Sequence, residues 1–589
     1  MGVTADDLLA AGNQLEDRRE FEAALEVYRH ALTVSPTYAR AHLNIGNALR
    51  NLDRLDEAAT AFRNALQCEP AYFQARFNLG SLLTSQGEFS AAEAELREVL
   101  RLEPELAEAA VMLADVLDST QRPDEAEAEL LHALRLRPDL SLAAFNLAHL
   151  LLRMNRLEEA EKWILRASEL APRVLPYASS SYCFAMNLRS ELSSEAIFDA
   201  HVRMGKAISN AAGPPFTTFS NTRQADRRLR LGYVSGDLKQ HPVGLLMRPV
   251  LTQHDRSKFE VHCYFNGEKA DSVTRALQQT SDYWHEIAGS SDNDAANVIR
   301  SHEIDILVDL AGHSGNTRLP LFARRAAPVQ ATWLGYLNTT GLTTMDYRIC
   351  DGYAERDGIA DRLHTERLYR LPDSQWCYAP WLAVGPIDLP HRDQPSALVF
   401  GSFNQLQKIS DASLDLWCSV LTALPEARLV VVGVSEQRSR RVLLDKLDQR
   451  DIATDRIAIH GRMGPLEYFR MIGNVDIALD SYPYNGATTT LDTLWMGTPM
   501  VALEGDRGIA RGGYSILRSL GLAELVAATP REYVAVNVRL ARDETLRNRL
   551  RTSLRARMEA SPLMNAPKFV AGLEAGYRHM WRSYCSPGV

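Results

Sequence analysis

Cysteine is scarce in this sequence, and the apolar runs are short. The seven cysteines are odd in number, include no CxxC pair and are scattered: Cys68, Cys183, Cys263, Cys350, Cys377, Cys418 and Cys585. This usage excludes a disulfide framework and a zinc ribbon, and it is typical of a reducing compartment. Apolar runs such as Leu429 to Val434 have the length of a strand and fall far short of the roughly 20 residues that span a membrane.

The sequence also lacks an excess of basic residues. It carries 65 lysines and arginines against 74 aspartates and glutamates, a net charge of −9, whereas a nucleic-acid-binding protein is more often basic. The first residues, MGVTADDLLAAGNQLED, do not show the basic and then apolar order of a signal peptide. We therefore expect a soluble, cytoplasmic protein with neither nucleic acid nor a membrane as its partner.

The composition is otherwise that of a globular protein. Of the 589 residues, 46% are apolar and 24% are charged, which excludes a disordered or collagen-like chain. A chain of this length corresponds to about three to five domains.

A repeat of 34 residues occupies the beginning of the chain. Small residues and prolines each recur at this spacing, in the two series Gly12, Gly46, Gly80, Ala114, Ala148 and Pro36, Pro70, Pro104, Pro138, Pro172. Small residues let two helices approach closely, and proline ends a helix because it lacks the backbone donor. The pattern is that of the tetratricopeptide repeat, five times over residues 5–172, and such an array has a concave surface suited to binding an extended peptide.

From residue 229 onward, short strand-like runs alternate with helical stretches. The runs cover 229–235, 260–265, 305–310 and 331–336, and a second set covers 397–403, 428–434, 457–462, 476–480 and 499–503. This alternation predicts two successive parallel sheets with helices on both faces. We therefore expect an all-α superhelix followed by α/β: a helical linker region over 173–228, a first Rossmann-like lobe over 229–395 and a second over 396–566. A last helix over 567–589 is expected to pack back across the first lobe.

The segment NVDIALDSYPYNGATTTLDTLWMG (474–497) carries the strongest sign of a ligand site. A predicted strand ends at Asp480, a loop containing Gly486 follows, and a helix begins near Thr488 and Thr489. Ligands of open α/β sheets bind beyond the carboxyl ends of the strands, and a helix start offers free N–H groups to a phosphate. The alternative is that the threonines only cap the helix.

Two further predicted strands are followed by candidate chemistry. Lys408, in GSFNQLQKIS (401–410), is a cation suited to a diphosphate, with Gln405 as a neutral partner. His241 precedes Pro242 in a strand-to-helix loop, where histidine acts as a general base or as a hydrogen-bond donor. Surface solvation of the lysine and a structural role for the histidine are the alternatives.

Four segments in order resemble the O-GlcNAc transferase and SPINDLY-like family: GYVSGDLKQHPVG (232–244), APVQATWLGYLNTTG (327–341), FNQLQKI (403–409) and YNGATTTLDTLWMGTPMV (484–501). The resemblance covers nearly the whole chain and implies a GT-B fold, with an N-terminal catalytic lobe and a C-terminal lobe that binds the nucleotide sugar. It implies an inverting, metal-independent transfer of GlcNAc from UDP-GlcNAc to Ser or Thr of proteins, with no cofactor.

By position, the resemblance also implies roles for individual residues. His241 is a catalytic or substrate-contacting histidine, and Lys408 is the lysine that binds the diphosphate. The expected contacts to the nucleotide sugar are Gln405, Met463, Gly464, Pro465, Tyr468, Gly486, Ala487, Thr488, Thr489 and Asp492. In the repeats, Asn44, Asn78 and Asn146 share one register, and asparagines there grip the acceptor peptide in animal members.

Some positions depart from the animal members. Ala487 and Tyr468 stand where those proteins have histidines, and Leu337-Asn338 stands where many relatives have Pro-Gly. A GDP-fucose-dependent, SPINDLY-like protein O-fucosyltransferase therefore remains an alternative. A peptide-binding scaffold with an inactive transferase body is the second alternative.

The distribution of histidines favours no metal site. His285, His313 and His460 show no ligand spacing with a carboxylate or thiol cluster. We therefore expect Lys408 and the helix start at Thr488 to supply the positive charge that a leaving diphosphate needs.

Overall fold

The computed structural model describes residues 3–154, 156–171, 175–383, 397–435 and 437–586. The chain divides into two compact units, Met1–Ala178 and Ser179–Val589.

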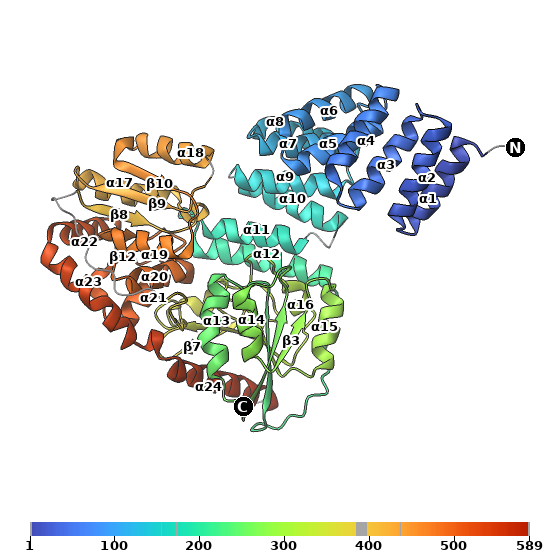
Figure 1. Ribbon diagram of the computed structural model, residues 1–589. Coiled ribbons are helices and arrows are strands. Elements are labelled where there is room, and N and C mark those ends of the chain that lie inside the picture. The colour runs from blue at the N-terminus through green and yellow to red at the C-terminus, as the bar shows by residue number, and fades with distance from the viewer. Residues whose placement is uncertain (1–2, 155, 172–174, 384–396, 436, 587–589) are drawn as a thin grey trace. The chain divides into compact units, whose positions relative to one another are not determined.

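The first unit consists of successive pairs of helices (Figure 1). Their bounds are α1 (Ala5–Asp17), α2 (Phe21–Val34), α3 (Ala39–Asn51), α4 (Leu55–Cys68), α5 (Phe73–Gln86), α6 (Phe89–Leu102), α7 (Ala107–Ser119), α8 (Pro123–Leu136), α9 (Ser141–Arg153) and α10 (Leu157–Leu170). The second helix of a pair ends two residues before the repeated proline, as with Val34 and Pro36. The predicted tetratricopeptide superhelix is confirmed.

The small residues of the repeat are set by close helix packing. A Cβ atom added to Gly46 of α3 would lie 2.4 Å from the ring of Phe62 on α4, and Gly12 meets Tyr28 in the same way at 2.2 Å. The aromatic ring of one helix therefore occupies the space that the missing side chain leaves on the other.

The second unit begins at Ser179, within α11 (Leu175–Asn187), and continues with α12 (Ser194–Ala212). The sheet of the first lobe has the order β3-β2-β1-β4-β5-β6-β7 with parallel neighbours. Its strands are β1 (Leu229–Ser235), β2 (Phe259–Phe265), β3 (Tyr283–Glu286), β4 (Ile306–Asp309), β5 (Val329–Thr332), β6 (Tyr347–Asp351) and β7 (Arg367–Leu371), with helices α13 (Pro242–Gln253), α14 (Ser272–Thr280), α15 (Asp292–Ser301) and α16 (Leu319–Ala323).

The sheet of the second lobe repeats this arrangement with the order β10-β9-β8-β11-β12-β13. Its strands are β8 (Val399–Ser402), β9 (Arg428–Val432), β10 (Ile457–His460), β11 (Ile477–Leu479), β12 (Met500–Leu503) and β13 (Val526–Ala527), and its helices are α17 (Asp411–Ala423), α18 (Gln437–Asp448), α19 (Pro465–Asn474), α20 (Thr488–Trp495), α21 (Gly512–Ser519), α22 (Pro530–Arg542) and α23 (Glu544–Glu559). Both sheets thus have the Rossmann order, as predicted.

The strand order places the candidate residues. In each lobe the order reverses beside the first strand, between β1 and β4 and between β8 and β11. Ligands of doubly wound sheets bind outside the carboxyl ends of the strands at this switch point. His241 follows β1, Lys408 follows β8 and Asp480 follows β11.

The last helix, α24 (Ala566–Cys585), is coloured dark red in Figure 1 and lies along the first lobe, shown in green. The hydroxyl of Tyr577 lies 3.1 Å from that of Tyr233 on β1, and Glu574 pairs with His254 at 2.9 Å. The ring of Phe569 stacks on Trp333 with centroids 6.0 Å apart. This helix therefore completes the core of the first lobe.

One predicted strand is wrong in extent, and some strands of the structure were not predicted. The run 331–336 was expected as a strand, but β5 ends at Thr332, because Leu334 adopts a φ of 72° and the chain turns there. The sequence runs of β3, β6, β7 and β13 were not predicted. Among the described helices, none is long and apolar enough to cross a membrane.

Candidate active site

The start of α20 presents backbone donors that no side chain caps. The residue before the helix is Ala487, whose side chain makes no capping hydrogen bond. The hydroxyls of Thr490 and Thr493 donate to backbone carbonyls one turn earlier. The alternative that the threonines only cap the helix thus has no side-chain cap bond to support it. The Thr488 hydroxyl is buried and without a partner, so the helix start is built to receive an acceptor such as phosphate.

A buried bracket holds this helix start in place. One carboxylate oxygen of Asp480 accepts from the amide of Gly486 at 2.8 Å and from the side-chain amide of Asn404 at 3.0 Å. The carbonyl oxygen of Asn404 in turn accepts from the Thr489 hydroxyl at 2.8 Å. A Cβ atom on Gly486 would lie 2.2 Å from that hydroxyl, so the glycine is required by the close approach.

Lys408 lies at the end of the short helical turn Leu406–Lys408 and reaches the same loop. Its ammonium group donates to the carbonyl of Asn485 at 3.3 Å and lies 4.1 Å from the centre of the Tyr484 ring. Burial lowers the pKa of Lys408 to about 8, and the negative charge of Asp480 opposes this shift. A cation that is only partly hydrated in this way interacts strongly with an anion.

His241 is the residue that precedes α13. Its Nδ1 accepts from the amide of Val243 at 3.4 Å, and Asp237 lies 3.7 Å from the same nitrogen. Burial lowers the pKa of His241, and the charges of Lys239 and Lys408 contribute to the shift. The ring is therefore neutral at pH 7, and in this arrangement its proton is on Nε2, the nitrogen that faces away from the helix.

Four of the residues expected to contact the nucleotide sugar lie near the surface. Gln405, Gly464 and Pro465 are exposed, and Met463 is half-buried. Gly464 and Pro465 begin α19. Their contacts to a nucleotide stay a prediction.

Asp492 lies in a buried polar network that the sequence did not indicate. Its carboxylate accepts from the Tyr378 hydroxyl at 2.8 Å, from the Trp381 indole at 3.3 Å and from the Tyr468 hydroxyl at 3.4 Å. Burial raises the pKa of Asp492 to about 7. The predicted contact of Asp492 with a ribose is untested. A ribose hydroxyl would share the carboxylate with these three donors.

In the repeat unit, two asparagines of the predicted register bind their neighbours. The side-chain amide of Asn44 donates to Asn13 and that of Asn78 donates to Asn47, each at 2.8 Å. Asn146 is half-buried in the same register. The side-chain N–H groups of Asn44 and Asn78 therefore link successive repeats. The side-chain oxygens of these two asparagines take no part in the two bonds.

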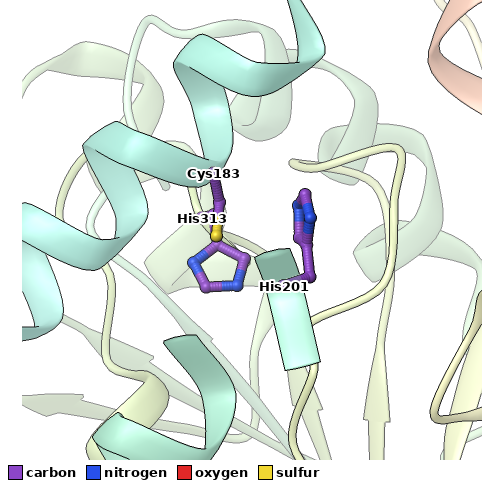
Figure 2. Close-up of side chains that lie close together, drawn as sticks. All are labelled: Cys183, His201 and His313. Carbon is purple, nitrogen blue, oxygen red and sulfur yellow. The ribbon is translucent and has the colours of Figure 1, made fainter. Parts of the chain in front are cut away.

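The fold brings together histidines that the sequence spacing kept apart. Cys183 on α11, His201 on α12 and His313 after β4 have potential ligand atoms within 4.8 Å of one another (Figure 2). The ring nitrogens of His201 bind the Ile197 carbonyl and the Tyr336 hydroxyl, both at 2.7 Å. Those of His313 bind Ser180 at 3.1 Å and the Thr340 carbonyl at 2.9 Å.

These hydrogen bonds satisfy both imidazoles without an ion, so the cluster has the properties of a polar core. Burial lowers the pKa of His201 to about 4 and that of His313 to about 3. Both rings are therefore neutral. A second group, His262, His285 and His302, lies at the β3 edge, where His262 and His285 are 3.2 Å apart in a ring-to-ring hydrogen bond.

The chain matches Glycosyl transferase family 41 over residues 151–377 and 388–573, and tetratricopeptide repeat families over 12–53, 45–107 and 83–142. A relative from Arabidopsis thaliana, "Probable UDP-N-acetylglucosamine--peptide N-acetylglucosaminyltransferase SPINDLY", is 36% identical over 425 residues, which are 70% of this chain and 46% of that protein. The relative SEC of the same plant, named with the same activity, is 28% identical over 70% of this chain and 43% of its own length. The chain thus spans about half the length of the curated relatives it matches.

One solved structure matches almost the whole chain. It is a mutant of the Thermobaculum terrenum O-GlcNAc transferase, with 33% identity and a TM-score of 0.71, and the match covers 93% of this chain and 98% of that one. The family match covers well over half of the residues, and it includes both Rossmann lobes. The chain therefore belongs to glycosyl transferase family 41.

Proposed function

We propose that this protein transfers GlcNAc from UDP-GlcNAc to Ser or Thr hydroxyls of proteins. One observation carries the proposal: the ammonium group of Lys408 reaches the loop that leads into the uncapped start of α20, at the switch point of the second sheet. A cation and free backbone donors at this place suit the diphosphate of a nucleotide sugar. The names of the plant relatives and of the solved bacterial protein supply the identity of the sugar and its acceptor.

The reaction is a single displacement with inversion. The acceptor hydroxyl oxygen forms a bond to the anomeric carbon while the bond from that carbon to the β-phosphate oxygen breaks. The products are the glycosylated side chain, UDP and a proton. Negative charge develops on the leaving diphosphate, and groups that are already in place to meet it lower the barrier.

Lys408 and the α20 start are the groups that neutralise this charge, and the proposal requires no metal ion. The amides of the first turn and the Thr488 hydroxyl donate to phosphate oxygens, and the Lys408 ammonium adds a full charge. His241 donates from Nε2 to an oxygen of the sugar or the acceptor, because its Nδ1 already accepts from the helix. In this form it positions the substrate and does not remove a proton.

The repeat unit is proposed to bind the protein acceptor along its concave surface, with Asn44, Asn78 and Asn146 among the contacts. The carbonyl oxygens of Asn44 and Asn78 remain for a peptide amide, since the amide donors of both already bind a neighbouring repeat. A cytoplasmic location, as expected from the scattered cysteines, belongs to the same proposal.

The first test is calorimetric titration of the full chain with UDP, UDP-GlcNAc, GDP and GDP-fucose, without added metal and both before and after addition of a chelator. Selective binding of UDP and UDP-GlcNAc is expected. Selective binding of GDP would overturn the choice of donor in favour of the fucosyl alternative, and binding of none of the four would favour the scaffold alternative. Loss of UDP binding on chelation would overturn the metal-independent mechanism.

A further inference from the structure

Asp480 is a buried carboxylate at the centre of the candidate site, and no role was predicted for it. It is 4% exposed and directly follows β11. Its Oδ1 atom accepts three hydrogen bonds: from the Ser481 amide at 2.9 Å, from the Gly486 amide at 2.8 Å and from the Asn404 side chain at 3.0 Å. The other oxygen, Oδ2, is buried without a partner.

The bonds to Oδ1 connect three parts of the second lobe. Asn404 follows β8, Asp480 follows β11, and Gly486 lies in the loop that leads into α20. Asn404 extends the connection to the first turn of α20 through Thr489. These bonds anchor the loop to the two strand ends, and their loss would leave the direction of the α20 start less well fixed.

The uncompensated oxygen leaves a negative charge inside the lobe. Oδ2 faces Gly513 at the start of α21, where an added Cβ would come within 2.9 Å of it. The charge of Lys408 acts on the Asp480 carboxylate and favours its ionised form. The carboxylate in turn raises the pKa of the Tyr533 phenol on α22, which burial already raises. Lys408 itself is also faced by the Tyr484 ring and by the neutral His241.

We propose that Asp480 is a positioning residue for the nucleotide diphosphate. Through Oδ1 it orients the α20 start, and through its charge it keeps Lys408 protonated. The proposal rests on the proposed function, because it assumes that a nucleotide diphosphate occupies this place. In this proposal Asp480 acts through Lys408 and the start of α20, and it touches neither the sugar nor the phosphates.

The two roles can be separated by two substitutions. Asp480→Asn is isosteric and keeps an oxygen for the three donors, but it removes the charge. Lys408 then loses the negative charge that opposes the lowering of its pKa, so the lysine should deprotonate at lower pH. Asn404→Ala keeps the charge but breaks the connection to Thr489. It should weaken binding at every pH and leave the position of the titration unchanged.

A matched control is available on the same strand. Asp476 lies at the opposite, amino end of β11, where its carboxylate accepts from the Val399 amide at 2.8 Å. Asp476→Asn therefore removes a carboxylate of the same strand without changing the charge beside Lys408.

The experiment is titration of the full chain with UDP between about pH 6 and about pH 9, with circular dichroism to check folding. Wild-type affinity should fall as Lys408 loses its proton. In Asp480→Asn this fall should move to lower pH by about one unit, and in Asn404→Ala the affinity should drop about tenfold with no such movement. Asp476→Asn should behave as wild type.

The outcomes separate the two proposals. If wild type binds no UDP, the proposed function and this inference both fail. If wild type binds UDP and folded Asp480→Asn keeps the wild-type pH dependence, the role of the charge is wrong. If Asp480→Asn does not fold, Asn404→Ala decides the orienting role, and wild-type affinity in that variant would overturn it.

Discussion

The ammonium group of Lys408 lies 4.1 Å from the centre of the Tyr484 ring and donates to the carbonyl of the next residue, Asn485. The lysine comes from the carboxyl end of β8, and the tyrosine belongs to the loop between β11 and α20. A cation over a ring face is attracted to it without losing its charge. Tyr484 thus holds Lys408 next to the helix start that it is proposed to assist.

Removing this cation should abolish transfer. In Lys408→Met we expect the transfer rate to fall by at least about 100-fold, because the developing diphosphate charge loses its fixed cation. The measurement is the rate of GlcNAc incorporation from UDP-GlcNAc. Lys446→Met serves as the control, since Lys446 of α18 pairs with Asp411 on an exposed surface. Equal activity of the two variants would contradict the role of Lys408.

Asp492 should make stability depend on pH. Burial raises its pKa from 3.8 to about 7, so between these values the folded state holds a proton that the unfolded state has lost. Stability therefore falls as pH rises through this window. Asp492→Asn should abolish this contribution and be more stable than wild type at about pH 8, by on the order of 2 kcal/mol, but not at about pH 4.

Urea denaturation at both pH values measures this effect. Asp445→Asn is the control, because Asp445 is an exposed carboxylate on α18. Parallel stability curves for wild type and Asp492→Asn would show that the carboxyl titrates normally.

Substitution of Asn78 should weaken the binding of protein acceptors and leave the binding of the nucleotide-sugar donor unchanged. Asn78→Ala removes the 2.8 Å bond to Asn47 and one contact proposed for the peptide, so we expect a higher KM for a protein acceptor. The affinity for UDP should not change. Asn51→Ala is the matched control, since Asn51 is exposed and donates to a carbonyl of its own helix. An unchanged acceptor KM in Asn78→Ala would exclude the asparagine from acceptor binding.

Gly46 should tolerate no larger side chain. Gly46→Val would drive its side chain into Phe62, whose ring lies 2.4 Å from the position of the added Cβ, at a cost of about 1 to 3 kcal/mol. In calorimetry, the transition of the repeats should move to lower temperature. Arg50→Ala, an exposed change on the same helix, should leave it in place. If both variants melt alike, the packing does not set the choice of glycine.

The parts of the fold that could be predicted depend on local pattern. Gly46 packs against Phe62, and Gly12 packs against Tyr28, each pair only a few helical turns apart in the chain. Because such a local contact recurs with the period of the repeat, the period reveals the structure. The strands around the switch points, β1, β4, β8 and β11, lie in largely apolar runs and were found. The edge strand β3 reads YWHE and β7 reads RLYRL, and runs that are half polar carry no strand signal of this kind.

The site could be predicted as far as it follows the strand ends. Lys408 and Thr489 lie in the segments that follow predicted strands, which is why the sequence singles them out, and their contacts with a nucleotide stay a prediction. Tyr378 and Trp381 reach Asp492 from more than 100 positions away, and contacts at such distance leave no spacing in a single sequence. The unpaired oxygen of Asp480 is likewise a property of the folded environment alone.

The position of α24 affects the order in which the protein can fold during synthesis. The helix supplies Phe569, Glu574 and Tyr577 to a lobe whose first strand begins at Leu229. The ribosome must therefore make the complete second lobe before the first lobe can close its core. Until then the surface around Trp333 and Tyr233, which α24 covers in the folded protein, is uncovered in the nascent chain.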